Sequence, residues 1–315
     1  MSMDTSSTVV SYWIGELPTI TELHFKSFLF NNDLNFKYIL YFDLDGSDSL
    51  RPISSAHPML QFQNSNIQIK YFSLSKTMSK FGVAPFRKKT EKRIAKYVSY
   101  KKKTISSKWL PQIPNYNSRL RDFKKLHLHS ELGFNFDHGQ SFCNLVSNLT
   151  YRSDIFRSII ANDYQNDNLL YVDLDTCFTQ PFSEYKWTNS FVSQWGTSNF
   201  ANSAVMFLSA KDRTIRSNIL KELVRTNSAW PWTLYSHENC EKFGLEIRGI
   251  SNFDPAWTPG SPLESNSEGF FKQTPNLDVI VRSILEECFL VHWHNQWRIV
   301  PETESPYTYF LELYR

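Results

Sequence analysis

The fold of this chain is decided by Leu169-Leu170-Tyr171-Val172-Asp173-Leu174-Asp175-Thr176, near the middle of its 315 residues. Four apolar residues in a row predict a strand that is buried on both faces, as in the sheet of an α/β protein. On a strand, the i, i+2 spacing of the two aspartates points both carboxylates to the same side. Such a pair suits Mg²⁺ or Mn²⁺, and α/β sheets bind ligands beyond the C-terminal ends of their strands. The stretch therefore predicts either a metal site at a strand end or two solvated acids.

The composition is that of a well-packed globular protein. Hydrophobic residues make up 41% of the chain and aromatic residues 16%, and the length suits a single α/β domain, 1–315, with an insertion. A net charge of +3 excludes a polyanion binder that uses the whole surface. The four cysteines show no CxxC pair and no zinc-like spacing, which favours reduced thiols. Without a signal peptide or an apolar run of about 18 residues, a cytoplasmic protein is expected.

Outward from the central stretch, hydrophobic periodicity predicts alternating strands and helices. A helix from Thr19 or Thr21 to Asn31 is expected between the first two strands. This order predicts a βαβ opening and a largely parallel sheet. Further strands and helices are expected beyond the central stretch, and 230–269 is expected to form loops. The expected strands are 9–14, 36–42, 67–72, 191–194, 204–208 and 289–293, and the later helices are 154–164, 215–226 and 278–287.

A basic segment lies within 80–118 and is expected to be a helix and loop inserted into the domain. Between Arg87 and Lys108 there are ten lysines and arginines, and Glu91 is the only acid. Apolar residues at helical spacing make the segment amphipathic, so it either lies on an anionic membrane surface or presents a solvated helix face. No nucleic-acid motif accompanies it, and nucleic acid binding is not expected.

A polar group precedes the central stretch in Ser153-Asp154-Ile155-Phe156-Arg157. Asp154 and Arg157 are spaced i, i+3 in the first turn of an expected helix and therefore share a face. Ser153 is placed to be the N-cap of that helix. Taken alone, the group is also compatible with a capped helix that carries a surface ion pair.

Together, the Ser-Asp-x-x-Arg group, the stretch 169–175 and Pro181-Phe182 resemble the sugar-nucleotide-binding region of glycosyltransferases with the GT-A fold. Members include bacterial capsule and O-antigen transferases, yeast-type mannosyltransferases and clostridial glucosylating toxins. The opening Tyr12-Trp13-Ile14-Gly15-Glu16-Leu17-Pro18 is similar to the first strand and loop of bacterial members. The resemblance implies a Rossmann-like, mostly parallel sheet flanked by helices. A Gly-Gly pair of the family is replaced by Gln165-Asn166-Asp167-Asn168, which is expected to loosen the turn before the strand.

The resemblance also implies roles for individual residues. Asp173 and Asp175 would hold Mn²⁺ or Mg²⁺, which neutralises the leaving diphosphate. Ser153, Asp154 and Arg157 would bind the donor. Other residues implied at the donor are Trp13, against the base or else an ordinary core tryptophan, and Asn199 and Asn202, in a loop similar to the asparagine-bearing loop of the family.

Two histidines, His292 and His294, flank Trp293 near the end of the chain. In an extended strand they point the same way and Trp293 points the other way. Family members commonly end in a histidine motif with a nearby tryptophan that meets the metal or the diphosphate. His292 with Asn295 fits this motif best, with Trp297 as the tryptophan. Either histidine is a candidate metal ligand.

The resemblance predicts a metal-dependent hexosyltransferase that moves a sugar from a nucleotide-sugar donor to a glycan or lipid-linked glycan. The expected donor is a UDP-sugar. The resemblance implies retention of configuration, so the leaving phosphate can accept the proton and no catalytic carboxylate is singled out. Glu238 and Asp254 are candidates for holding the acceptor. Membrane contact through Arg87–Lys108 would make the protein peripheral and favour a lipid-linked acceptor in bacterial surface polysaccharide synthesis.

A rival interpretation comes from Tyr41-Phe42-Asp43-Leu44-Asp45-Gly46, which resembles the nucleophile motif of haloacid-dehalogenase-type phosphatases. Asp43 would attack the phosphate and Asp45 would act as acid and base. The later acidic pair of those enzymes is missing in its usual form, because the chain contains no Asp-Asp and no Gly-Asp. A third interpretation is a non-catalytic protein that binds sugar nucleotides or glycans on the same fold.

Overall fold

The computed structural model describes residues 7–14, 17–44, 62, 66–80, 148–196, 198–226, 229–294 and 299–315. The basic insertion expected within 80–118 lies outside these residues, apart from Lys80. Asp45, Asn295 and Trp297 lie outside them as well.

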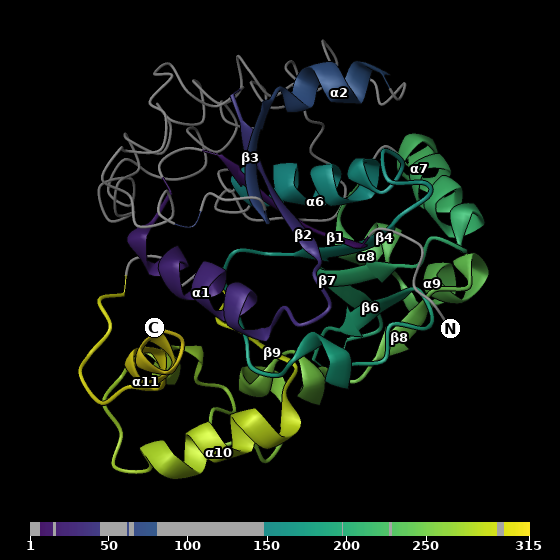
Figure 1. Ribbon diagram of the computed structural model, residues 1–315. Helices are drawn as coiled ribbons and strands as arrows, with labels where there is room; N and C mark the ends of the chain where they lie inside the picture. Colours follow the sequence, from purple (N-terminus) through teal and green to yellow (C-terminus); the bar gives the residue numbers. More distant parts are fainter. Residues whose placement is uncertain are drawn as a thin grey trace, which may run out of the picture.

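A seven-stranded mixed sheet forms the centre of the protein, in the order β3-β2-β1-β4-β7-β6-β8 (Figure 1). From β3 to β4 all neighbours are parallel, β7 runs antiparallel to both β4 and β6, and β8 is parallel to β6. The strands are β1 (Ser7–Ile14), β2 (Lys37–Asp43), β3 (Ile67–Phe72), β4 (Asn168–Val172), β6 (Phe191–Gln194), β7 (Ala201–Leu208) and β8 (Glu246–Arg248). The predicted α/β fold with a mostly parallel central sheet is confirmed.

Helices cover both faces of the sheet (Figure 1). On one face lies α1 (Glu22–Asn31), and on the other lie α6 (Asn148–Ile160), α7 (Arg213–Thr226) and the short α2 (Leu74–Lys80). Leu170 and Val172 of β4 join the core on the α1 face, while Leu169 and Tyr171 join the core beneath α6. Because side chains alternate along a strand, the central strand supplies both cores, as its uninterrupted apolar run predicted.

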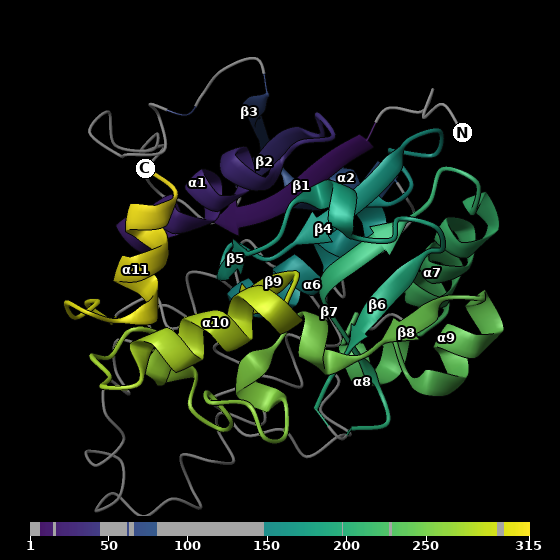
Figure 2. The same ribbon diagram turned by 60° about the horizontal axis from the view of Figure 1, so that its bottom comes forward.

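A smaller antiparallel sheet pairs β5 (Thr176–Phe178) with β9 (Leu290–His292), so that Thr176 lies opposite His292. It shares a third core with α10 (Leu277–Glu287) and α11 (Pro306–Leu313), which lie beside it in Figure 2. The backbone N–H of Trp293 also donates to the carbonyl of Asp175 at 2.9 Å. This pairing brings the C-terminal histidines to the aspartates that follow β4.

Two local expectations at the site are wrong. The helix α6 begins at Asn148 and not at Asp154, so Ser153 lies inside it and is not its N-cap. Asp173 and Asp175 lie in a bend after β4 and not on the strand itself. The bend still brings both carboxylates to one place, because Thr176 at once begins a strand of the second sheet.

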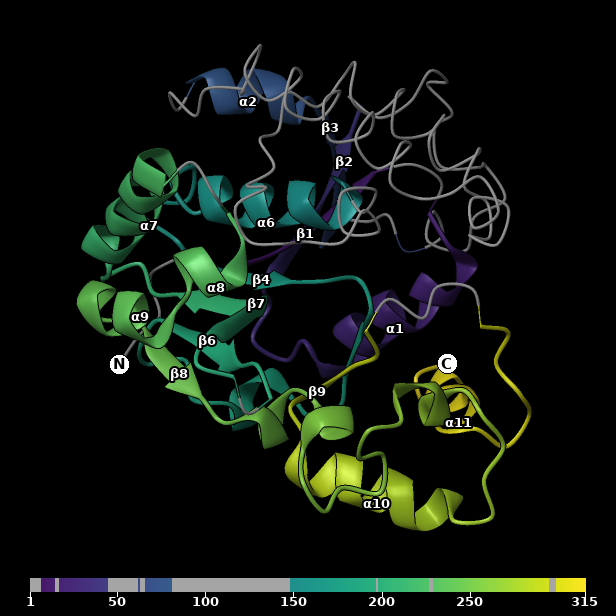
Figure 3. The same ribbon diagram turned by 180° about the vertical axis from the view of Figure 1, so that it is seen from behind.

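Other boundaries differ as well. Thr21 does not cap α1: its hydroxyl donates to the carbonyl of Pro18 at 2.6 Å, which closes the preceding 3-10 turn Thr19–Thr21. The region 230–269 contains α8 (Pro231–Leu234) and α9 (His237–Phe243) besides loops. These helices lie together with α7 at one end of the sheet (Figure 3). Ser236 caps α9, and Gly244 ends it at φ 77°, so local signals for this helix were present.

The turn between α6 and β4, expected to be loose, is held by the buried Arg216 of α7. Its guanidinium donates to the carbonyls of Tyr164 and Asp167, the latter at 2.6 Å. The Asn168 side chain accepts from the backbone N–H of Ala210 at 3.0 Å. These contacts fix the turn that the absence of a Gly-Gly pair was expected to loosen. Among the described residues, no helix is both long enough and apolar enough to cross a bilayer.

Candidate functional site

Two overlapping groups of candidate metal-ligating side chains lie beyond the end of β4. One consists of Asp173, Asp175 and His292, and the other of Asp254, His292 and His294; within each, the ligand atoms lie within 4.8 Å of one another. His292 belongs to both, with Nε2 3.3 Å from Asp175 Oδ2 and Nδ1 3.8 Å from Asp254 Oδ2. His294 Nε2 lies 2.8 Å from Asp254 Oδ2. The structure thus joins residues that are far apart in the sequence.

Hydrogen bonds from one backbone N–H and two side-chain hydroxyls hold the bend that carries the two aspartates. The N–H of Asp173 donates to the carbonyl of Ala204 on β7 at 2.9 Å. The Ser11 hydroxyl donates to the carbonyl of Val172 at 2.6 Å, and the Thr176 hydroxyl donates to that of Asp173 at 2.9 Å. The bend is therefore fixed on three sides before any ligand binds.

The residues present fit a divalent cation. Nε2 of His292 is buried and makes no hydrogen bond of good geometry among the described residues. Burial raises the pKa of Asp173, although the nearby Arg157 opposes the shift. Burial disfavours the charged imidazole of His292, but the surrounding carboxylates of Asp175, Asp254 and Asp173 together outweigh it and raise the pKa of His292 to about 9. A cation that replaces this proton would keep the negative charge of the carboxylates neutralised.

Arg157 links the metal-ligating groups to α6. Its Nη2 lies 3.4 Å from Asp154 Oδ1 and donates to Asp173 Oδ2 at 3.3 Å. Its Nη1 donates to the hydroxyl of Ser203 on β7 at 3.2 Å. The Asp154–Arg157 pair predicted by the i, i+3 spacing is present, but both residues are buried, so it is not a surface ion pair. Burial, opposed by Arg157, raises the pKa of Asp154 to about 7.

Two residues at the site were missed or assigned elsewhere from the sequence. The Tyr171 hydroxyl donates to Asp173 Oδ1 at 2.6 Å and lies 2.8 Å from the Ser153 hydroxyl. The i, i+2 spacing of Tyr171 and Asp173 could have indicated that the two side chains point the same way. Asp254, a candidate for holding the acceptor, lies against both histidines, with its Oδ2 2.8 Å from His294 Nε2 and 3.8 Å from His292 Nδ1. No local motif marked it as a neighbour of the histidines.

The remaining predicted residues lie at or near the same end of the sheet. Trp13 is partly buried against the core of the α1 face, three residues beyond Val10, which pairs with Tyr171. Asn202 is buried, and its Oδ1 accepts from the N–H of Ala204 at 2.8 Å. Asn199 and Glu238 are exposed. Within the described part of the chain, neither of these two side chains hydrogen-bonds to the metal-ligating groups.

Asp43, the nucleophile of the rival interpretation, is fully buried in an ion pair. Arg152 Nη2 lies 2.5 Å from its Oδ2, and the Tyr12 hydroxyl donates to the same atom at 2.7 Å. Its other oxygen accepts from the N–H of Leu74 at 3.3 Å. A carboxylate enclosed by these donors is not placed to attack a phosphate.

The chain was compared with known proteins. No protein-family model matches it, and no curated protein matches it. Solved glycosyltransferase structures match over nearly the whole chain at low identity. The apo bifunctional glycosyltransferase WbbM is 9% identical with a TM-score of 0.48, over 99% of this chain and 50% of that one. The PaToxG glycosyltransferase is 14% identical with a TM-score of 0.39, and the match covers 98% of this chain and 87% of PaToxG. The apo glycosyltransferase GlyE of Streptococcus pneumoniae TIGR4 is 11% identical with a TM-score of 0.45, and the match covers 98% of this chain and 60% of GlyE. The chain therefore spans half the length of WbbM.

Proposed function

We propose that this chain is a metal-dependent glycosyltransferase of the GT-A type, which moves a sugar from a nucleotide-sugar donor to a hydroxyl of an acceptor. The observation that supports this most is the convergence of Asp173, Asp175 and His292 at the C-terminal end of β4. Beside them lies the buried Asp154–Arg157 pair of α6. A cation site and a fixed polar group at the end of a central strand suit a charged donor.

Asp173, Asp175 and His292 would hold Mn²⁺ or Mg²⁺, with Asp254 orienting the imidazole of His292 through its Nδ1 side. When bound, the ion supplies positive charge for the leaving diphosphate. The site itself contributes Arg157, whose charge is fixed by two aspartates and Ser203 and costs no reorganisation during the reaction.

Asp154 and Arg157 are proposed to bind the donor sugar, with Ser153 beside them and Trp13 against the base. The pKa of Asp154, raised to about 7, lets this carboxyl either donate or accept a hydrogen bond near neutral pH. We propose retention of configuration, with the acceptor's proton taken by the leaving phosphate. No side chain is then needed as a strong base.

The test is calorimetry or thermal shift with UDP, GDP and CDP, each with and without Mn²⁺. We expect one of the three nucleotides, with UDP as the expected one, to stabilise the protein only when metal is present. At a nucleotide concentration of 100 times its Kd, the free energy of unfolding should rise by about 2.7 kcal/mol. The effect should be lost in Asp175→Ala and kept in Glu286→Ala, an exposed acid on α10.

Three outcomes separate the functions. No response to any nucleotide, together with hydrolysis of a generic phosphate ester that is lost in an Asp43→Asn variant shown to be folded, would refute the transferase and favour a phosphatase. Nucleotide binding without hydrolysis or transfer would favour a binding protein. Release of UDP from a UDP-sugar by the wild type, lost in Asp175→Ala, would support the proposal.

The basic segment Arg87–Lys108 supports a narrower proposal about the acceptor. Its ten basic residues would attract anionic lipids, at roughly 1 kcal/mol for each lysine or arginine near the surface. A lipid-linked glycan would then be the acceptor. Flotation with liposomes tests this, and absence of binding both with and without anionic lipid would remove it.

A further inference from the structure

A chain of buried side chains lies beneath the bend that carries Asp173 and Asp175. Its members are Ser11 of β1, His24 of α1 and Tyr38 of β2, all fully buried. Nε2 of His24 lies 2.7 Å from the Tyr38 hydroxyl, which donates to the Ser11 hydroxyl at 2.6 Å. One run of hydrogen bonds therefore joins three elements of the fold.

The two ends of this chain meet the two ends of the bend. At one end, the Ser11 hydroxyl donates at 2.6 Å to the carbonyl of Val172, the residue before the aspartates. At the other end, Nδ1 of His24 lies 3.0 Å from both the carbonyl and the hydroxyl oxygen of Thr176, the residue after them. A neutral imidazole donates at one nitrogen and accepts at the other, so both nitrogens can be bonded in either tautomer. The chain therefore spans the bend from one flank to the other.

Aromatic rings surround the chain. The ring centroids of Phe25 and Phe28 lie 5.4 Å and 4.9 Å from that of Tyr38, and the centroid of Phe178 lies 5.5 Å from that of His24. Burial lowers the pKa of His24 to about 4, so near pH 7 the imidazole is neutral and acts through its hydrogen bonds. Hydrogen bonds are stronger in such surroundings than in water, and a buried polar network makes the local structure rigid. Both flanks of the bend are thus held by a rigid core.

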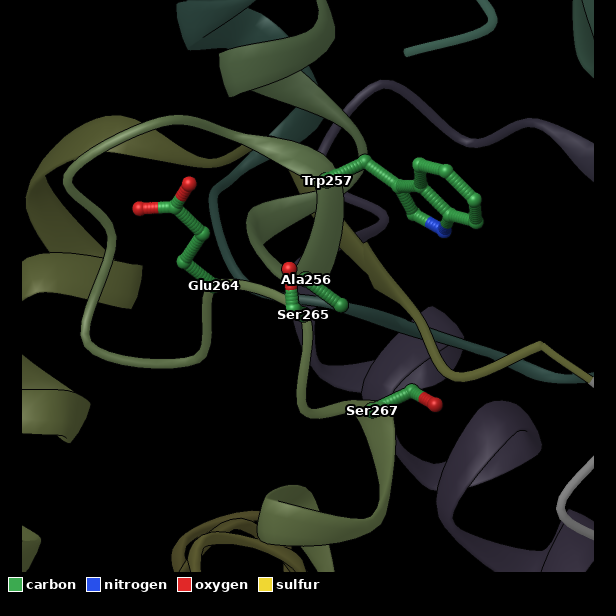
Figure 4. A pocket seen from close by; sticks show the side chains of 5 residues that line it. All are labelled: Ala256, Trp257, Glu264, Ser265 and Ser267. Carbon is green, nitrogen blue, oxygen red and sulfur yellow. The ribbon is translucent and has the colours of Figure 1, made fainter.

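The border of the site near Asp254 is built differently. It has a pocket lined by Ala256, Trp257, Glu264, Ser265 and Ser267 (Figure 4). The indole of Trp257 is 48% exposed, and its ring centroid lies 5.6 Å from that of His294. The carboxylate of Glu264 points to the opposite side of the segment between it and Trp257 (Figure 4), so the two side chains do not brace one another. Compared with this partly open border, the chain of Ser11, His24 and Tyr38 is a buried support for the bend.

We propose that Ser11, His24 and Tyr38 form a positioning network for the metal site, which sets the spacing of the carboxylates of Asp173 and Asp175. A binding site of this kind requires ligands that are held within about 0.5 Å of the productive geometry. The network acts on the carboxylates through the backbone on both sides of them. The inference rests on the proposed function, because it assigns the support of the same cation site.

The experiment is calorimetric titration of the full chain with Mn²⁺ alone, with Tyr38→Phe and Ser11→Ala as the variants. Tyr38→Phe keeps the ring and removes the hydroxyl that links His24 to Ser11. Loss of a group that orients metal ligands typically weakens metal binding about 10–100-fold. We therefore expect Mn²⁺ binding to weaken about tenfold in Tyr38→Phe and at least about threefold in Ser11→Ala. The double variant should bind about as weakly as the weaker single variant, because both changes break one chain.

The matched controls are Tyr41→Phe and Ser190→Ala. Tyr41 lies on the same strand β2 but in the core of the opposite face, with its hydroxyl 2.9 Å from that of Tyr164. Ser190 is buried just before β6, and its hydroxyl donates to Asp212 at 2.6 Å. Both controls should lose some stability in urea and keep the Mn²⁺ affinity within about twofold of wild type. A second readout is the EPR spectrum of bound Mn²⁺, whose zero-field splitting reports the arrangement of its ligands and should change in Tyr38→Phe but not in Tyr41→Phe.

Mn²⁺ affinities and spectra of Tyr38→Phe and Ser11→Ala that equal those of the wild type would overturn the positioning role, whatever stability the variants lose. Ser11→Ala removes a single oxygen atom and decides the question by itself if Tyr38→Phe does not fold. Fully multiplicative losses in the double variant would overturn the single chain, and absence of Mn²⁺ binding by the wild type would overturn the network as a whole. The proposed function fails separately, when Mn²⁺ binding depends on Tyr38 but no nucleotide shifts the melting of the wild type.

Discussion

Replacing Asp43 by Asn should destabilise the fold, because the carboxylate is part of a buried ion pair. Asp43 and Arg152 are both buried, their closest atoms are 2.5 Å apart, and the Tyr12 hydroxyl donates to the same carboxylate oxygen. The pair joins the end of β2 to α6, and Tyr12 adds β1. Removing one partner of a buried ion pair leaves the other charge uncompensated, which typically costs about 3–5 kcal/mol.

That cost is a large share of the ~5–15 kcal/mol by which proteins of ordinary stability are folded. We therefore expect Asp43→Asn to lower the free energy of unfolding by about 3–5 kcal/mol, and Arg152→Met by a similar amount. The double variant should lose less than the sum, because neither change then leaves a lone buried charge.

The assay is urea unfolding followed by tryptophan fluorescence, with a double-mutant cycle over the two positions. Asp163→Asn is the control, since it breaks a surface pair with Lys80 at 3.5 Å, and exposed pairs contribute at most about 1 kcal/mol. The free energy of unfolding of Asp43→Asn could instead lie within about 1 kcal/mol of the wild-type value while phosphate-ester hydrolysis is abolished. In that case Asp43 is a functional carboxylate and the structural role assigned to it is wrong.

Three further predictions follow from other parts of the structure. Asp254→Asn should weaken Mn²⁺ binding about 10–100-fold, because it removes the carboxylate that orients the imidazoles; calorimetry against Asp278→Asn checks this, and equal affinities would contradict it. Burial lowers the pKa of His24 to about 4, so its contribution to stability is complete above pH 6.5 and is lost as the pH falls to 4, by up to about 3 kcal/mol. The decline in the free energy of unfolding between pH 7 and 4 should be smaller by that amount in His24→Gln, and parallel curves would refute the assignment. Arg216→Lys should cost about 1–3 kcal/mol in urea unfolding, since an ammonium cannot reproduce the fork that binds several carbonyls; Arg213→Lys, on the exposed side of α7, should change little.

Local pattern was enough to predict the parts of the fold whose signals lie within a few residues. The run of apolar residues before Asp173 predicted β4, and the i, i+3 spacing of Asp154 and Arg157 predicted a shared face. The start of α6 was placed too late, because Ser153 has the chemistry of an N-cap but lies within a longer helix. Its hydroxyl is instead turned to Tyr171.

The rest of the site depends on contacts between distant segments. The pairing of Thr176 with His292 decides which side chains face Asp175, and no short-range pattern encodes it. Asp254 immediately precedes the 3-10 turn Pro255–Trp257, within a region expected to be loops, and only the packed structure brings it to the histidines. A buried acid without a neighbouring motif cannot be told from a solvated one by sequence reasoning alone.

The position of His292 between two carboxylates has a mechanical consequence. Asp173 and Asp175 directly follow β4 of the central sheet. His292 belongs to β9, whose Val291 packs in one core with α10 and α11. A cation bound here would cross-link these two parts of the chain. The binding free energy of the cation would add to the free energy of unfolding. Loss of the cation would let β9 separate from β5 more readily. The supply of the metal would then govern how long the protein survives heat and proteases, apart from any reaction that it carries out.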